Sequence, residues 1–176
     1  MEPEFIRRHA AYHEAGHVIA DLLYGYRFTY VTIRSDEPGE YEGVVYGSTR
    51  GRAQELAVVQ LAGIVAAAKM AGGDPWEHPP RFDDDSADIA TAGTFIDNWV
   101  AFLKKTYGES PYRERLWEDT EMKTRLLVDG NWDAIDCVAG ALLEQETLSY
   151  SEVIRLLEKR CPDFRAAKNH EQSPGR

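Results

Sequence analysis

The sequence predicts a mainly α-helical fold in which a small β-hairpin packs near the first helix. Most of the chain shows the apolar spacing of helices, and glycine or proline separates most of these segments. Two short runs of β-branched and aromatic residues, close to one another, predict the hairpin. With 176 residues the chain is long enough for one domain, expected at 1–161 and followed by a disordered polar tail at 162–176.

The first helix is expected from Pro3 to Tyr24. Proline is favoured in a first helical turn, and Gly25 can end the helix. The strand-like runs follow at 28–33 and 41–46, and they are separated by a turn-forming segment. A hairpin alone is only marginally stable, so these strands must pack on helices.

Most of the remainder of the chain is expected to be helical, with a proline-rich loop at 74–81. Residues 53–70 are apolar almost all round and predict a central buried helix. The longest apolar stretch of the chain, 57–68, is too short to cross a bilayer. Ser149 and Glu152 have the spacing of a capping box, so a short last helix should begin there. Further helices are expected at 85–105, 111–128 and 131–146.

Composition and charge exclude several classes of partner. The net charge is -10 and the basic residues are scattered, so we expect neither nucleic-acid binding nor affinity for an anionic membrane surface. Membrane insertion is not expected either, because the longest apolar stretch is too short. The chain starts without the apolar segment of a signal peptide, and a cytoplasmic location is expected. Cys137 and Cys161 fit reduced, buried thiols, although one bridge between the last two helices stays open.

The segment His13-Glu14-Ala15-Gly16-His17 carries the most chemical information. Residues four apart lie on one face of a helix, so His13 and His17 can bind the same metal ion, with Glu14 beside it. Zinc held by three protein ligands keeps a position for water, whose proton a neighbouring carboxylate can accept. This is the machinery of a metallopeptidase.

Small residues surround these histidines. The alternative to a metal site is that His13 and His17 are two ordinary histidines on an amphipathic helix. Gly16, however, costs about 1 kcal/mol relative to alanine within a helix, which predicts that another element approaches closely there. The small residues are Ala10, Ala11, Ala15, Gly16 and Ala20.

The third metal ligand is left open by these residues alone. Ala20 and Leu23 occupy the positions where a metzincin has glycine and histidine, so that class is excluded. Glu55 would serve in a thermolysin-like site. Four aspartates lie within 83–88, where one of them can bind metal or the group can simply cap a helix, with Asp85 as N-cap and Asp88 in the reciprocal position.

Several segments match, in order and spacing, the peptidase domain of FtsH-type membrane proteases, and the chain resembles this family. In these proteases an AAA+ ATPase precedes a helical zinc peptidase. The resemblance implies that zinc is held by His13, His17 and Asp88 and that Glu14 is the general base. The matching segments are 11–17, 31–33, Gly43, 61–63, 86–89 with Ala92, and 142–148.

The chain contains no phosphate-binding loop, so ATP-driven unfolding is not expected within it. We therefore expect a zinc-dependent metalloendopeptidase that hydrolyses unfolded or extended polypeptides without its own ATPase. The alternative is a non-proteolytic, zinc-containing binding or regulatory module related to the peptidase. Expected partners are the polypeptide substrate and either further copies of the chain or a separate ATPase.

Substrate contacts are expected along one hairpin strand, because an extended peptide can add to an exposed sheet edge. We assign this edge to Thr29, Val31 and Ile33. His78, in a proline-rich loop, is expected to overhang the cleft and to donate to the developing oxyanion. His9, one turn before His13, is expected to be a solvated histidine.

Overall fold

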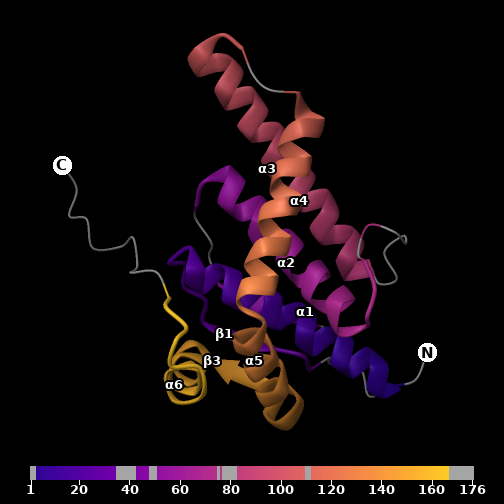
Figure 1. Cartoon of the computed structure of the whole chain (residues 1–176), viewed down its shortest axis with the longest axis vertical. Coiled ribbons are helices and arrows are strands. Elements are labelled where there is room, and N and C mark those ends of the chain that lie inside the picture. Colours follow the sequence, from indigo (N-terminus) through magenta and orange to yellow (C-terminus); the bar gives the residue numbers. More distant parts are fainter. Residues whose placement is uncertain are drawn as a thin grey trace, which may run out of the picture.

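The computed structural model describes residues 3–34, 43–47, 51–74, 76, 83–109 and 112–166, and within them the chain forms six helices and three short strands (Figure 1). The predicted mainly α fold with a small sheet is confirmed. The helices are α1 (Pro3–Leu23), α2 (Ala53–Met70), α3 (Asp83–Tyr107), α4 (Arg113–Gly130), α5 (Trp132–Gln145) and α6 (Tyr150–Arg160). The strands are β1 (Tyr30–Thr32), β2 (Val44–Tyr46) and β3 (Thr147–Ser149).

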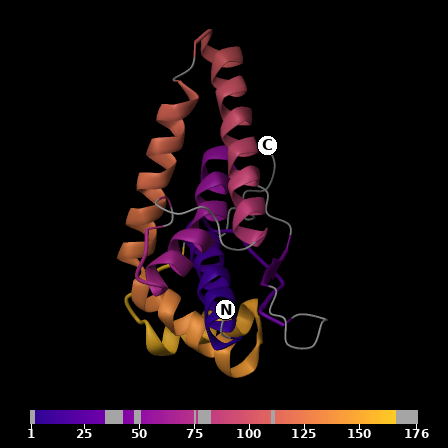
Figure 2. The ribbon, with the colours of Figure 1, turned by 90° about the vertical axis from the view of Figure 1, so that its right-hand side faces the viewer.

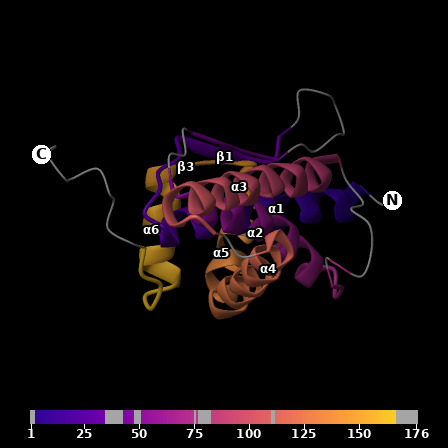
Figure 3. The same ribbon diagram turned by 90° about the horizontal axis from the view of Figure 1, so that it is seen from above.

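The α1 and α2 helices form the centre of the fold. Seen from above, they lie between the sheet on one side and α4 and α5 on the other (Figure 3). The α3 helix packs against α2, and α5 packs against α1. The ends of α3 and α4 that meet at their connection extend together beyond the other elements (Figure 2).

The central position of α2 agrees with its sequence. Among the described helices, α2 alone is long and apolar enough to cross a membrane. The apolar stretch recognised in the sequence is shorter than this helix. Yet 61% of it is buried inside the fold, as in the core helix of a soluble protein. It contacts α1, α3 and α4, which accounts for apolar residues on all its faces.

The α1 and α2 helices approach most closely at Gly16. A Cβ atom on Gly16 would overlap the carbonyl oxygen of Ala62 and lie 2.9 Å from the Cβ of Ala66. Only glycine leaves room for this backbone contact. The packing reason that the sequence predicted for Gly16 is therefore confirmed.

The sheet is antiparallel, with the strand order β2-β1-β3. The predicted hairpin forms β1 and β2, but β3 was not predicted. It lies between two helices and has only three residues, too few for a period-two pattern to appear. Glu146 has a left-handed backbone (φ 60°) and ends α5, and its carbonyl accepts a hydrogen bond from the Ile33 N–H (2.9 Å).

Helix ends follow the predicted signals. Gly25 has φ 74° directly after α1. The capping box is present at the start of α6, where Glu152 accepts from the Ser149 N–H (2.7 Å).

Phe164, in the segment expected to be disordered, packs against the core, and residues 167–176 lie outside the described part.

A pair of glycine substitutions tests the α1–α2 contact. We expect Gly16→Ala to destabilise the protein by about 1–3 kcal/mol, because the added methyl group overpacks the crossing. Gly140→Ala, in α5 with open space around it, should instead stabilise by about 0.5–1 kcal/mol. Denaturant unfolding of both variants measures these changes. Equal effects would show that the crossing does not require glycine.

Candidate metal centre

Three side chains from α1 and α3 converge on one point. The Oδ2 atom of Asp88 lies 2.9 Å from Nε2 of His13 and 3.0 Å from Nε2 of His17. The two Nε2 atoms are 3.0 Å apart. His13 and His17 are buried, and the Asp88 side chain is 18% exposed. The structure thus brings together the three residues that the resemblance implies as metal ligands.

The opposite ring nitrogens are held by other groups. Nδ1 of His17 lies 2.8 Å from the carbonyl oxygen of Val59 on α2, and a carbonyl can only accept, so this nitrogen carries a proton. Nδ1 of His13 lies 3.2 Å from Oδ1 of Asp85, an ion-pair contact without good hydrogen-bond direction. A neutral ring that keeps its proton on Nδ1 directs the lone pair of its Nε2 atom at Asp88.

Two lone pairs and a carboxylate within 3.0 Å of one another require positive charge between them. Ligands bound at 2.0–2.1 Å around a tetrahedral zinc ion lie about 3.3 Å apart. Adjustments of a few tenths of an ångström would accommodate such an ion. These buried groups are therefore positioned to bind a metal.

The pKa values of His13, His17 and Asp88 also indicate that positive charge is required between these groups. Burial alone would lower the pKa of His13, but Asp85 and Asp88 more than offset it and raise this pKa to about 10. The pKa of His17 is also raised, because attraction to Asp88 outweighs burial. Burial would raise the pKa of Asp88, yet both imidazoles hold it well below its usual range. Protons on the histidines can thus supply the charge that a metal would supply.

Glu14 lies beside the converging ligands. One oxygen of its carboxylate lies within 4.8 Å of the donor atoms of His13 and His17, and the residue is only 3% exposed. A Cβ atom on Gly43 would overlap this carboxylate, so the glycine permits the chain entering β2 to cover it. On the other side, a Cβ on Gly63 would lie 2.5 Å from Nε2 of His17. Glycines on two elements therefore make room for the site.

The site opens into a cleft of about 280 Å³. Carboxylates and imidazoles from α1 and α3 lie together with aliphatic side chains from α2 and β2. Among the described residues, no lysine or arginine lines this cleft. The lining residues are His13, Glu14, His17, Asp21, Gly43, Val44, Val45, Val59, Gln60, Ala87 and Asp88.

The assignment of Thr29, Val31 and Ile33 to an exposed, substrate-binding edge is wrong. The β1 strand is the middle strand, because β3 occupies the side that the sequence left free. Val31 and Ile33 are fully buried in the core. The edge strand beside the cleft is β2. His78, the other expected substrate contact, lies outside the described residues.

The structure also differs from what the sequence suggested for Glu55 and His9. Glu55 accepts a hydrogen bond from the Tyr26 hydroxyl (2.5 Å) and does not line the cleft, so it does not take the thermolysin-like position. His9 is not freely solvated, since its side chain is 13% exposed and lies 3.8 Å from Asp85.

Sequence reasoning missed the contact of Asp85 with His13, since Asp85 was considered as the N-cap of the helix or as one of four possible metal ligands. The helix begins at Asp83, so Asp85 is inside it, and it is 5% exposed against His13. A usable signal was its spacing. Three residues before Asp88 on a helix, Asp85 shares the face that meets the histidines.

Asp21 was also missed. It lies on α1 four residues after His17, hence on the same face, and it is 2% exposed. Its Oδ1 atom is buried and has no hydrogen-bond partner among the described residues. Burial raises the pKa of Asp21 from 3.8 to about 6, although His17 acts to lower it.

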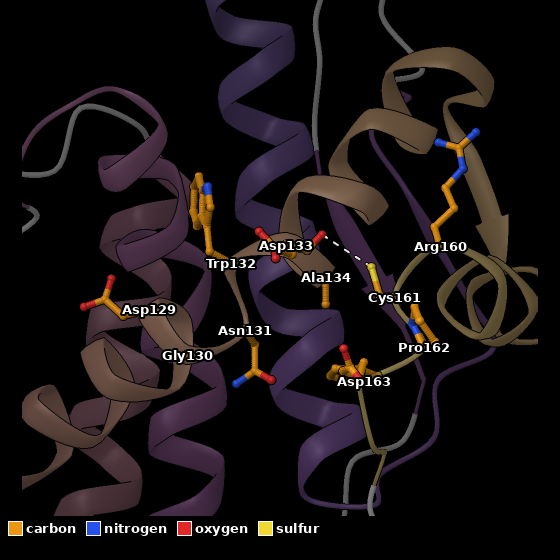
Figure 4. Close-up of a pocket in the computed structure, with 11 residues that line it drawn as sticks. Asp129, Gly130, Asn131, Trp132, Asp133, Ala134, Arg160, Cys161, Pro162 and Asp163 are labelled. Carbon is orange, nitrogen blue, oxygen red and sulfur yellow. Dashed lines mark hydrogen bonds between the residues drawn. The ribbon is translucent and has the colours of Figure 1, made fainter.

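A second cavity, of about 310 Å³, lies between the start of α5 and the end of α6 (Figure 4). There the Cys161 thiol donates to the carbonyl oxygen of Asp133 (3.6 Å). Cys161 and Cys137 are free thiols. The pKa of Cys137 is raised to about 11, mainly by burial and to a smaller extent by the neighbouring Cys161 thiol. None of the predicted site residues lines this cavity.

Because Asp85 contacts His13, we expect the loss of its charge to lower the affinity of the site for a metal ion. Asp85→Asn should weaken metal binding about 10- to 100-fold, because a carboxylate behind a ligating histidine orients the ring and raises its basicity. Competition with a chromophoric chelator measures this affinity. The matched control is Asp119→Asn, an exposed position on α4. Equal affinities for both variants would contradict the orienting role.

The unpartnered carboxylate of Asp21 predicts a pH-dependent stability effect. Its folded pKa lies above its unfolded one, so its protonated form favours folding, and this contribution is lost as the pH rises through about 6. Asp21→Asn should therefore be more stable than the wild type by about 1–3 kcal/mol at pH 8. The difference should shrink as the pH falls from 6 to 4. Thermal unfolding with a chelator present tests this, and a pH-independent difference would contradict it.

Comparison with models of known protein families finds no match to this chain, and no curated protein matches it either.

Proposed function

We propose that this protein is a zinc-dependent endopeptidase that cleaves unfolded or extended polypeptides. One observation carries the proposal. The Nε2 atoms of His13 and His17 and the Oδ2 atom of Asp88 lie within 3.0 Å of one another, with the carboxylate of Glu14 beside them. A purely structural zinc site gains nothing from such a carboxylate, whereas a hydrolytic site requires one.

The donor set favours zinc. Two imidazole nitrogens and one carboxylate oxygen are typical ligands of catalytic zinc sites, which keep one position open. Zinc held by these atoms would lower the pKa of its bound water to about 7 and polarise the scissile carbonyl. The Val59 carbonyl and Asp85 orient the two rings for this purpose.

Glu14 is the proposed general base. Its carboxylate accepts the proton of the attacking water and then delivers it to the leaving amine nitrogen. Gly43 lets the chain before β2 lie directly over this carboxylate, which limits its motion and shields it from bulk water. Burial of Glu14 to 3% exposure supports this role.

The β2 strand is the proposed platform for substrate. It is an edge strand and borders the cleft, so an extended peptide can add to it through main-chain hydrogen bonds. Val44 (45% exposed) and Tyr46 (58% exposed) leave apolar surface on this strand for substrate side chains. A segment packed inside a tightly folded protein cannot add to the strand in this way. The resemblance to FtsH-type peptidase domains supports the same reaction and substrate class.

Metal analysis tests the ligand set. The purified protein should contain about one zinc ion per chain, and His13→Ala or His17→Ala should lose it, since each removes one of three ligands. Asp88→Asn should weaken binding by at least the 10- to 100-fold typical of losses behind the ligands. Glu55→Gln is the control and should keep wild-type affinity. Full zinc occupancy in both histidine variants would contradict the assignment.

Replacing the proposed base tests the reaction. Glu14→Gln should retain zinc and fold but lose activity about 10²- to 10⁴-fold, because the amide cannot accept a proton. The wild type should cleave casein or short peptides without ATP and leave tightly folded proteins intact. Mass spectrometry of the products measures this. Zinc-loaded wild type that cleaves no unfolded substrate would instead favour the non-proteolytic binding module.

A further inference from the structure

Asp21 is a buried carboxylate that the proposed reaction does not use. It lines the cleft that contains the metal centre, is 2% exposed, and its Oδ1 atom has no hydrogen-bond partner among the described residues. An unsatisfied buried carboxylate is costly. The cost is accounted for if a ligand in the cleft supplies the missing partner.

The surroundings of Asp21 fit a long cationic side chain. Val44, Val45 and Val59 provide aliphatic walls along the same cleft. Lysine and arginine bury an aliphatic stem on apolar surface and pair their charged end with a carboxylate. Among the described residues that line this cleft there is no lysine or arginine to pair with Asp21, which leaves that position for a cationic side chain of the substrate.

A second metal ion fits Asp21 less well. Besides His13, His17 and Asp88, two groups of described residues have donor atoms close enough to share a metal, namely His9 with His13 and Asp85, and His13 with Glu14 and His17. Neither group includes Asp21. One carboxylate is sufficient for an ammonium or guanidinium group but not for a protein-bound metal.

We infer that Asp21 forms a specificity subsite that selects substrates with a lysine or arginine near the scissile bond. This inference rests on the proposed peptidase function and names its substrate class. Asp21 follows His17 by one helical turn, a rise of about 6 Å. Residues on one face of an extended peptide repeat at about 6.5–7 Å, so the selected side chain lies within two residues of the scissile bond. The net charge of -10 also attracts basic substrates.

Binding is measured separately from cleavage. The probes are short acetylated and amidated peptides of alanine and valine with one lysine at successive positions, and a matched set with norleucine. Zinc-loaded Glu14→Gln protein should bind the best lysine peptide about 10- to 100-fold more tightly than its norleucine counterpart. The double variant with Asp21→Asn should lose this preference, and the double variant with Asp119→Asn should keep it. Calorimetry gives the affinities, and zinc content and thermal unfolding verify each variant.

Cleavage of the same peptides gives the second readout. The wild type should show a lysine preference in kcat/KM at one position, and Asp21→Asn should reduce the preference while still cleaving norleucine peptides. Binding and cleavage with no lysine preference would overturn the Asp21 subsite and leave the peptidase proposal intact. Absence of both binding and cleavage would overturn the peptidase proposal and the subsite with it. A second metal ion per chain that Asp21→Asn removes would also overturn the subsite.

Discussion

Gly16 and Gly63 allow α1 and α2 to lie in direct contact at the level of the two histidines. A Cβ atom on Gly16 would overlap the backbone of Ala62, and one on Gly63 would lie 2.5 Å from Nε2 of His17. The same contact brings the Val59 carbonyl to 2.8 Å from Nδ1 of His17. The α2 backbone therefore fixes both the distance between the helices and the orientation of a proposed ligand.

The α3 helix completes the site by supplying negative charge. Asp85 and Asp88 lie three residues apart, so one helix face presents both carboxylates to opposite nitrogens of His13. Burial opposes charge on His13 and on Asp88, but the opposite charges around them offset that cost, so the pKa of His13 is raised and the pKa of Asp88 is lowered. The close approach of the α3 carboxylates to the α1 histidines thus depends on a positive charge between them, whether protons or a metal supply it.

Helix positions and the approach of Asp88 to the histidines could be predicted from the sequence, the latter through the family resemblance. The sheet edge could not. A strand of three residues, Thr147–Ser149, has too little pattern to recognise, and its pairing with β1 places Val31 inside the sheet. Asp85 and Asp21 were missed for another reason. Their importance depends on burial, which spacing along the chain indicates only once the facing helix is known.

Asp21 is a buried carboxylate that lowers the stability of the fold and lines the cleft of the candidate metal centre. Asp74, at the surface, is paired with Arg125 at 2.7 Å, and this contact holds its pKa low. Asp21 has no such partner for Oδ1 within the described residues, and burial raises its pKa instead. A neutral side chain there would favour folding near neutral pH. Because the charge lowers stability yet lies on the cleft wall one turn from His17, its role is best sought in what enters the cleft.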